Sequence, residues 1–129
     1  MQMHASCAAR HGLGVLVLGP AGSGKSSVVL ALVRAGFMLV ADDQVIVTDG
    51  VARGPAALSG LIEVRGVGIV QLPYLRAARI VIAVTIGRAE RVAGAAQHPT
   101  LGIPMINVDV TGAVARIEAS LRCPAIRIV

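Results

Sequence analysis

Short apolar runs alternate with glycine-rich and polar stretches along most of the chain. Each run is rich in valine, leucine or isoleucine and has the length of a strand buried in a sheet. These runs predict buried strands at residues 14–18, 37–41, 45–48 and 80–84, a returning strand at 51–53, an edge strand at 5–9, and a strand at 103–110 that Pro104 interrupts. The apolar pattern therefore predicts a sheet at the centre of the protein.

Two segments carry apolar residues at helical spacing instead. In the segment 25–35 the apolar positions are Val28, Val29, Leu32 and Val33, which lie on one face of a helix. Gly36 follows as the C′ residue that ends this helix. A second helix is predicted at 112–122, with Thr111 as its N-cap. The connections are predicted as a loop at 54–60, a short helix at 73–79 and a surface segment at 87–99.

A turn signal decides the fold class. Asp49-Gly50 separates the strands 45–48 and 51–53, and this dipeptide is typical of a tight hairpin. A purely doubly wound sheet would not place a hairpin after its second strand. The sequence therefore predicts an α/β protein, with a mixed sheet, flanking helices and an antiparallel β appendage. With 129 residues the chain is expected to form one domain, 1–129.

The stretch Gly19 to Ser26 fits G-x-x-x-x-G-K-[ST], the phosphate-binding P-loop, between a predicted strand and a predicted helix. Small residues let backbone N–H groups converge on an anion, and the helix N-terminus adds partial positive charge. In this motif Lys25 reaches the outer phosphates and the Ser26 hydroxyl ligates Mg²⁺. The predicted nucleotide-binding residues are Gly19, Pro20, Ala21, Gly22, Ser23, Gly24, Lys25, Ser26 and Ser27.

Two adjacent acids, Asp42 and Asp43, directly follow the apolar run 37–41. Carboxylates at the end of a strand beside a P-loop face the phosphates and Mg²⁺ in nucleotide-binding enzymes. A polar turn is the alternative, but the position one helix after the P-loop favours function. Adjacent residues of an extended chain point in opposite directions, so we expect only one of the two acids to face the γ-phosphate and the other to serve the metal or a neighbouring loop.

The stretch 61–70 alternates polar and apolar residues as a strand does, so Glu63 and Arg65 are expected on one face of it. Gly66 and Gly68 allow a close approach of the backbone or a positive φ. An exposed ion pair on an amphipathic strand explains Glu63 and Arg65 equally well from the pattern alone.

Composition narrows the class of partner. The net charge is +5, and eleven of the twelve basic residues are arginine, the exception being Lys25. The excess of arginine over lysine is typical of proteins from a GC-rich genome. The alternative explanation is a partner that carries phosphate groups or an acidic protein surface. Nucleic acid is not expected, because the arginines are scattered and the only aromatic residues are Phe37 and Tyr74.

Compartment and membrane association follow from simple signals. The longest uncharged apolar runs are shorter than the roughly 18 residues of a membrane-spanning helix. The first residues do not have the pattern of a signal peptide. Cys7 and Cys123 show no metal-binding spacing and are read as reduced, packed cysteines. We therefore expect a cytoplasmic protein with no membrane partner.

Three motifs together resemble the catalytic domain of HPr kinase/phosphorylase, most closely the truncated alphaproteobacterial forms that lack the N-terminal domain. They are the P-loop, then Leu39-Val40-Ala41-Asp42-Asp43, then Ile62-Glu63-Val64-Arg65-Gly66-Val67-Gly68-Ile69. The similarity is clear from about His4 to Ile69. It implies the P-loop kinase fold of this family, which is related to phosphoenolpyruvate carboxykinase.

The resemblance also implies roles for individual residues. Asp42 resembles the catalytic acid/base that takes the proton from the attacking serine hydroxyl, and Asp43 looks like its support. Ser26 and Glu63 look like the Mg²⁺ ligands. Arg65 resembles the signature arginine near the phosphates. His4 falls where the family has a histidine lining the active site.

The expected activity is therefore ATP-dependent phosphorylation of a serine on HPr or a nitrogen-type relative, in phosphotransferase-system signalling. ATP and Mg²⁺ are the expected cofactors, and a homo-oligomer of unspecified size is expected. The stretch 104–118 lacks the arginine and asparagine of the family's P-G-R-N-like segment, so phosphorylase activity is left open. The rivals are a small-molecule P-loop kinase or nucleotide hydrolase, and an ATP-binding regulator that transfers nothing.

Overall fold

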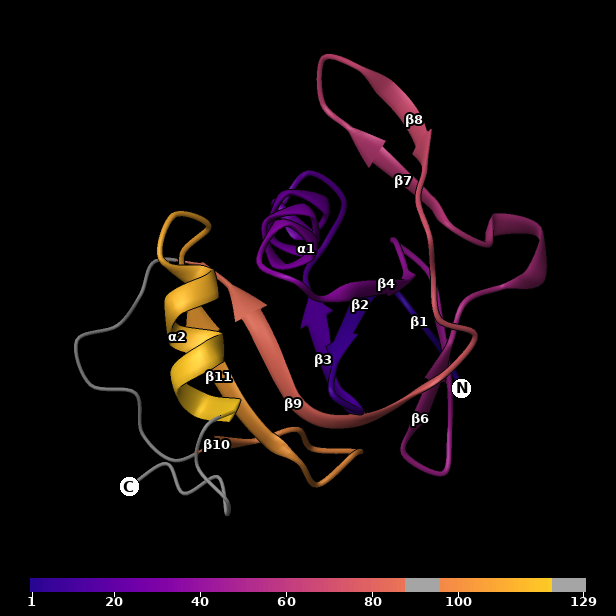
Figure 1. Cartoon of the computed structure of the whole chain (residues 1–129). Coiled ribbons are helices and arrows are strands. Elements are labelled where there is room, and N and C mark those ends of the chain that lie inside the picture. The colour runs from indigo at the N-terminus through magenta and orange to yellow at the C-terminus, as the bar shows by residue number, and fades with distance from the viewer. Residues whose placement is uncertain (88–95, 122–129) are drawn as a thin grey trace.

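A computed structural model of the chain describes residues 1–87 and 96–121 and confirms a mixed α/β architecture (Figure 1). In chain order the elements are β1 (Gln2–Met3), β2 (Ala5–Arg10), β3 (Leu13–Leu18), α1 (Lys25–Arg34), β4 (Met38–Ala41), β5 (Val45–Thr48), β6 (Val51–Arg53), the short 3₁₀ helix η1 (Ala56–Leu58), β7 (Leu61–Val64), β8 (Gly68–Gln71), β9 (Ala78–Ile86), β10 (Ala96–Gln97), β11 (Pro104–Val108) and α2 (Ala113–Leu121).

The central sheet has the strand order β4–β2–β3–β9–β11–β10. Strand β9 is parallel to both β3 and β11, whereas β2 is antiparallel to both β3 and β4. Strands β3, β4, β9 and β11 therefore all run in one direction, and β2 runs against them. Their carboxyl ends meet at one edge of the sheet, together with the start of β2.

The position of β2 differs from the prediction. An edge strand was expected at 5–9, but β2 lies between β3 and β4, and its residues Ala5 to Ala9 are buried. The small side chains of this segment explain the placement, because alanine, serine and cysteine fit between covered faces without needing much room. The two-residue turn His11-Gly12, with φ of 53° and 75°, returns the chain directly into β3.

The predicted antiparallel appendage is present as the ribbon β1–β5–β6, whose strand β6 pairs with the first residues of β9. Asp49 and Gly50 both have positive φ, 52° and 75°, between paired residues Thr48 and Val51. This is the backbone that a tight hairpin of the primed type requires. The hairpin prediction is confirmed.

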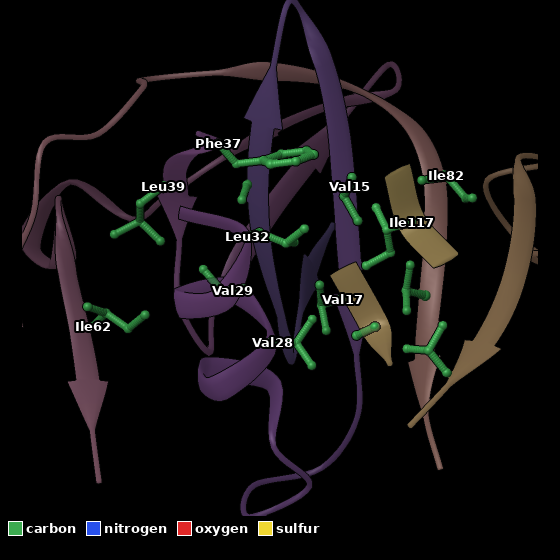
Figure 2. Packing of buried hydrophobic residues seen from close by; sticks show 14 residues of the cluster. Val15, Val17, Val28, Val29, Leu32, Phe37, Leu39, Ile62, Ile82 and Ile117 are labelled. Atoms are coloured by element: carbon green, nitrogen blue, oxygen red, sulfur yellow. The ribbon is translucent and has the colours of Figure 1, made fainter. Parts of the chain in front are cut away.

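Both helices pack on one face of the central sheet (Figure 2). The cluster there joins residues of α1 (Val28, Val29, Leu32), of β2, β3, β9 and β11 (Ala8, Val15, Val17, Ile82, Val84, Val108), of α2 (Ala113, Ile117), and Phe37, Leu39 and Ile62. A second cluster on the opposite face joins β2 and β3 to the ribbon through residues that include Cys7, Leu16, Val45 and Ile80. The sheet is therefore covered by helices on one side and by a β ribbon on the other.

Cys7 is a free thiol buried in the second cluster, as predicted for a reduced, packed cysteine. Burial raises its pKa from 9.0 to about 12, because a thiolate would lose its hydration there. Cys123 lies outside the described residues.

Helix α1 ends as predicted. Gly36 has φ of 99°, its N–H bonds to the carbonyl of Val33, and the N–H of Phe37 bonds to the carbonyl of Leu32. These two bonds form a Schellman motif, which satisfies carbonyls that the helix end would otherwise leave unpaired. The side chains of Leu32 and Phe37 lie in the same core cluster, so the cap also fixes where β4 begins.

Three local predictions are wrong. Residues 73–79 do not form a helix, because the Leu75 N–H bonds to the Leu39 carbonyl (2.8 Å) and holds the segment beside β4. The stretch 61–70 is not one strand but the hairpin β7–β8. The Gly112 N–H bonds to the carboxylate of Asp109 (2.7 Å), so Asp109 satisfies the start of α2 instead of Thr111.

The predicted surface segment 87–99 lies partly outside the described residues, as does the predicted helix end at residue 122. Of its described residues, Gly87, Gln97 and Pro99 are exposed, as expected of a surface segment. His98 differs: it is buried, and its Nδ1 accepts hydrogen bonds from the N–H groups of Thr100 and Leu101. Strand β11 begins at Pro104 and is not interrupted there.

Candidate active site

The glycine-rich loop between β3 and α1 has a backbone that glycine makes possible. Gly22 and Gly24 have φ of 81° and 105°, which residues with a Cβ rarely adopt. A Cβ on Gly19 would lie 2.4 Å from Ser23 Oγ, and one on Gly24 would lie 2.8 Å from Val110 Cγ2. The three glycines therefore let the loop fold closely on itself and into the first turn of α1.

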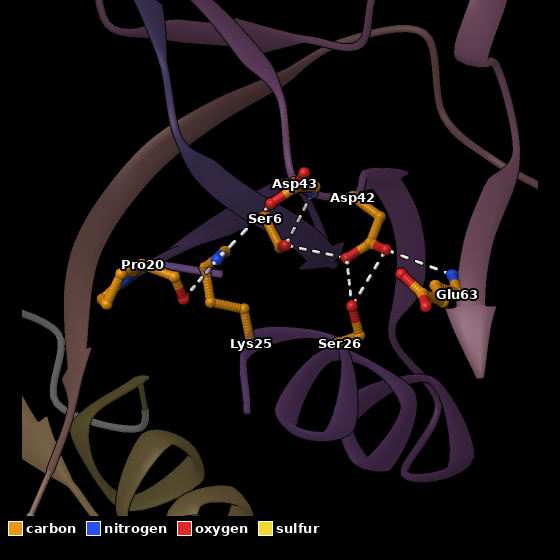
Figure 3. A network of polar contacts seen from close by, with 7 residues as sticks. All are labelled: Ser6, Pro20, Lys25, Ser26, Asp42, Asp43 and Glu63. Atoms are coloured by element: carbon orange, nitrogen blue, oxygen red, sulfur yellow. Dashed lines mark hydrogen bonds and ion pairs between the residues drawn. The ribbon is translucent and has the colours of Figure 1, made fainter. Parts of the chain in front are cut away.

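Lys25 opens α1, and its side chain is only 4% exposed. Its Nζ donates to the carbonyl of Pro20 (3.0 Å) and lies 3.5 Å from Asp43 Oδ1 (Figure 3). A buried ammonium needs such partners, because losing hydration without them costs several kcal/mol. The ammonium is thus held between the start of the loop and the acidic pair.

Asp42 is the centre of the polar network in Figure 3. The Ser26 hydroxyl lies 2.9 Å from each of its carboxylate oxygens, and the Ser6 hydroxyl donates to Oδ1 (2.8 Å). The backbone N–H of Glu63 donates to Oδ2 (3.2 Å). Three segments far apart in the sequence, β2, α1 and β7, therefore converge on this one carboxylate.

Ser6 is a residue of this network that the sequence did not indicate. It is fully buried in β2, and its hydroxyl also accepts a hydrogen bond from the Asp43 N–H (3.0 Å). One hydroxyl thus holds the side chain of the first acid and the backbone of the second. A serine inside a buried apolar run was the available signal, since buried hydroxyls almost always have a hydrogen-bonding partner.

The two acids face the same cavity, contrary to the prediction that they point in opposite directions. Asp43 has φ of 65°, and the N–H of Gln44 bonds to the Asp42 carbonyl (2.8 Å), which makes a γ-turn. Alternation holds only for extended residues, and the chain turns here. Aspartate is among the residues that tolerate this left-handed backbone best.

Glu63 and Arg65 reach the site from the β7–β8 hairpin, which projects beside α1 (Figure 1). Glu63 lies in β7, whereas Arg65 lies in the turn after it; the expectation of one shared strand face is therefore wrong. Both side chains are exposed and both line the cavity described next. The hairpin is anchored by Ile62, which is buried in the core under α1.

These residues line one cavity of about 780 Å³. Its lining residues are Ala21, Gly22, Ser23, Gly24, Lys25, Ser26, Ser27, Asp42, Asp43, Glu63, Val64, Arg65, Gly66, Val67, Gly68 and Val110. Gly19 and Pro20 stand just before this lining. His4 is exposed and does not line it, although it precedes Ala5, the partner of Leu18 at the start of the loop. Val110, after β11, is a lining residue that the sequence did not indicate.

The cavity fits a nucleotide with a divalent cation. Ser23 Oγ is buried and has no hydrogen-bonding partner within the described part of the chain, beside glycines that leave room for an anion. Three acidic and two basic side chains line the cavity, so the lining has a net negative charge and cannot neutralise a bound polyphosphate without an added cation. Mg²⁺ takes oxygen ligands, typically one or two carboxylates together with phosphates. The oxygens of Ser26, Asp42 and Glu63 are of that kind.

Within residues 1–87 and 96–121, no three histidine, cysteine or acidic side chains gather as a protein-only metal site would require. Among the described helices, none is long and apolar enough to cross a membrane.

Comparisons with known proteins agree with this arrangement. A family model described as HPr Serine kinase C-terminal domain matches residues 1–86. The HPr kinase/phosphorylase of Clostridium novyi (strain NT) is 45% identical over 78 residues, which are 57% of this chain and 25% of the relative. That of Clostridium tetani (strain Massachusetts / E88) is 35% identical over 114 residues, which are 82% of this chain and 37% of the relative.

A solved structure shares the fold. The Hpr(Ser) kinase/phosphatase from Coxiella burnetii matches with a TM-score of 0.78 at 23% identity, and the match covers 95% of this chain and 94% of that chain. By contrast, the chain spans only 25% and 37% of the length of the two clostridial relatives.

Proposed function

Since this chain belongs to the family of HPr serine kinase C-terminal domains, we propose that it transfers a phosphoryl group from ATP to a serine of HPr or of a nitrogen-type relative. The observation that carries the proposal is the contact of Ser26 with Asp42, at 2.9 Å to each carboxylate oxygen. It brings a carboxylate base to the first turn of the helix that the phosphate-binding loop precedes. An acid at that position suits a hydroxyl acceptor, whose proton must be removed.

The loop is proposed to hold the phosphates. Backbone N–H groups between Ala21 and Ser27, other than that of Ser23, which bonds to the Pro20 carbonyl (3.1 Å), supply donors, and the N-terminus of α1 adds partial positive charge. Lys25 Nζ, already turned toward the loop by its bond to Pro20, is the cation for the outer phosphates. Arg65, at the cavity wall, adds a second positive charge as negative charge shifts toward the leaving oxygen.

Asp42 is proposed as the base. A carboxylate has about four lone-pair positions, and three donors, from Ser6, Ser26 and Glu63, approach Asp42. One position remains for the hydroxyl of the acceptor serine. The serine oxygen forms a bond to the γ-phosphorus while its proton passes to Asp42, and the bond to ADP breaks. Asp43 is proposed to support this step by keeping Lys25 in place.

Ser26 and Glu63 are the proposed ligands of Mg²⁺, which, when bound, neutralises charge on the phosphates. His4, which directly precedes Ala5, the strand partner of Leu18, is proposed as a further contributor to the site, as the resemblance implies. A cytoplasmic location and homo-oligomeric assembly of unspecified size, both expected from the sequence, are further parts of the proposal. The reverse phosphorylase reaction stays open, because the stretch 104–118 lacks the arginine and asparagine of the family's P-G-R-N-like segment.

The test is a kinase assay with purified HPr and nitrogen-type HPr, with detection of phosphoserine. Wild-type protein is expected to phosphorylate one of them. Lys25→Ala is expected to lower the rate by on the order of 10² to 10³, because a cation on the transferring group is lost. Asp42→Asn is expected to lower it by about 10² to 10⁴, because the base is lost. Arg34→Ala, an exposed change in the last turn of α1, is the control and should leave the rate unchanged.

Absence of phosphoserine on every HPr-like acceptor would contradict the proposal. ATP turnover without a protein acceptor would favour a small-molecule kinase or a nucleotide hydrolase. Tight ATP binding without any transfer would favour a regulator that only binds ATP.

A further inference from the structure

A second cavity, of about 410 Å³, lies beside β4 and shares no lining residue with the first in the described part of the chain. It is lined by Val40, Arg53, Gly54, Ala56, Ser59, Tyr74, Leu75 and Arg76. Val40 belongs to the core cluster on the ribbon side of the sheet, whereas the first cavity opens beside α1. The proposed phosphoryl transfer uses none of these residues.

The walls of this cavity are fixed by close packing and by backbone hydrogen bonds. The Leu72 N–H bonds to the Gly60 carbonyl (2.8 Å), and a Cβ on Gly60 would lie 2.9 Å from Tyr74 Cδ1. A Cβ on Gly54 would lie 3.0 Å from the Val40 carbonyl oxygen. Three connecting segments therefore pack closely against one another and against β4 at the walls of the cavity.

The charges on its walls have one sign. Arg53 and Arg76 are the charged residues in the lining, and the described part of the lining includes no acid. Neither guanidinium has a hydrogen bond or an ion pair with a described residue, whereas Arg10 and Arg116 pair with Glu118 and Asp109. Two unpaired guanidinium groups on one cavity match an anion that has two or more oxygens, because the planar fork binds such oxygens in pairs.

The remaining walls are apolar. Tyr74 and Leu75 supply the apolar surface, and their side chains are 38% and 36% exposed, so a ligand in the cavity can reach them. The volume lies in the range of small-molecule sites, which combine apolar walls with a few polar groups. We propose that this cavity is a binding site for a small, multiply charged anion, a phosphate or a carboxylate, held by Arg53 and Arg76 against Tyr74.

The chain provides its own reporter for a test. Tyr74 is the single tyrosine and there is no tryptophan, so tyrosine emission of the purified full chain reports on this cavity alone. Inorganic phosphate and citrate, titrated separately, are the probes that distinguish a phosphate ligand from a carboxylate ligand. We expect a saturable change in emission with one or both, and sodium chloride of equal ionic strength should not reproduce it.

Arg53→Gln combined with Arg76→Gln is expected to weaken the response on the order of a hundredfold, since each charged hydrogen-bonding group contributes about tenfold. The matched control, Arg34→Gln combined with Arg79→Gln, removes the same charge from exposed positions outside the lining. This variant should keep the anion-dependent change in tyrosine emission. Lys25→Ala should also keep it, which separates this site from the phosphate-binding loop and from the kinase proposal.

A response that survives in the Arg53 and Arg76 double variant would overturn the proposal, and so would the absence of a saturable response with both probes. Emission that changes with protein concentration instead of anion concentration would show that a second copy of the chain covers the cavity, and would overturn it too.

Discussion

Ser6 carries two hydrogen bonds on one hydroxyl, and both lead to the acidic pair. It donates to the Asp42 carboxylate and accepts from the Asp43 N–H. Ser6 therefore positions Asp42, the proposed base, but is not itself the base. It also helps to hold the γ-turn that brings Asp43 to the same cavity. Its influence should fall on the transfer step more than on the binding of ATP.

Ser6→Ala is expected to lower kcat about tenfold, since one to two hydrogen bonds of roughly 1 kcal/mol each are lost. The KM for ATP should change little, because Lys25 and the loop keep their contacts. Ser6→Thr retains a hydroxyl and should restore most of the rate. Steady-state kinetics with an HPr-like acceptor and thermal unfolding of the three proteins provide the measurement. Equal loss in both variants at unchanged stability would contradict this role.

Among single residues, the sequence predicted the site residues that belong to a motif. It missed those that only the fold brings to the cavity. Lys25, Ser26 and Asp42 stand in recognisable patterns, and the structure brings them together as expected. Ser6 and Val110 have no local pattern, because their place at the cavity depends on which strands are neighbours. Strand pairing is a long-range choice that local spacing does not encode.

The elements show a similar division. The segments 14–18, 25–35 and 45–53 form nearly as predicted, because apolar spacing, a glycine cap and an Asp-Gly turn are local signals. The segment 73–79 differs from the predicted helix because a backbone hydrogen bond to β4, and not its own helix propensity, determines its conformation. The alternating pattern of 61–70 predicts one strand and not the hairpin β7–β8, because the pattern continues across the short turn.

The cap of α1 gives a prediction at the scale of an element. Gly36 has φ of 99°, and a Cβ there would meet only Arg10 Cδ at 4.0 Å, so the site is conformationally restricted but not crowded. Gly36→Ala should lower the free energy of unfolding by about 1 to 2 kcal/mol, the cost of a left-handed backbone for alanine. Urea unfolding followed by circular dichroism measures it.

Gly36→Asn is the matched variant, since asparagine tolerates this backbone better than alanine. It should lose clearly less stability than Gly36→Ala. If both variants lose the same amount, side-chain packing at this position, and not backbone conformation, would be responsible.

Across the whole molecule, Arg10 ties distant parts together. Its guanidinium donates to the Ala35 carbonyl (3.1 Å), pairs with Glu118 (3.1 Å) and lies 4.3 Å from the centre of the Phe37 ring. One side chain at the end of β2 thus contacts the end of α1, the start of the next segment and α2. The pair with Glu118 joins residues 108 positions apart in the chain.

Arg10→Ala should lower the free energy of unfolding by about 1 to 2 kcal/mol, the sum of a partly exposed ion pair and a cation–π contact. Glu118→Gln alone should cost less than about 1 kcal/mol, since Arg10 keeps its other two contacts. A double-mutant cycle, read by chemical denaturation, separates the two contributions. A cost for Glu118→Gln equal to that of Arg10→Ala would show that the ion pair carries the whole effect.

The insertion of β2 between β3 and β4 has a consequence for the order in which the chain assembles. Strands β2, β3 and β4 with helix α1 form one continuous segment, which ends at the acidic pair. Contacts that close short loops form at a lower entropic cost than contacts between distant segments. We therefore expect the phosphate-binding loop, Ser6 and both acids to come together before β9 pairs with β3. The β7–β8 hairpin and α2 would then pack against a site whose other residues are already in place.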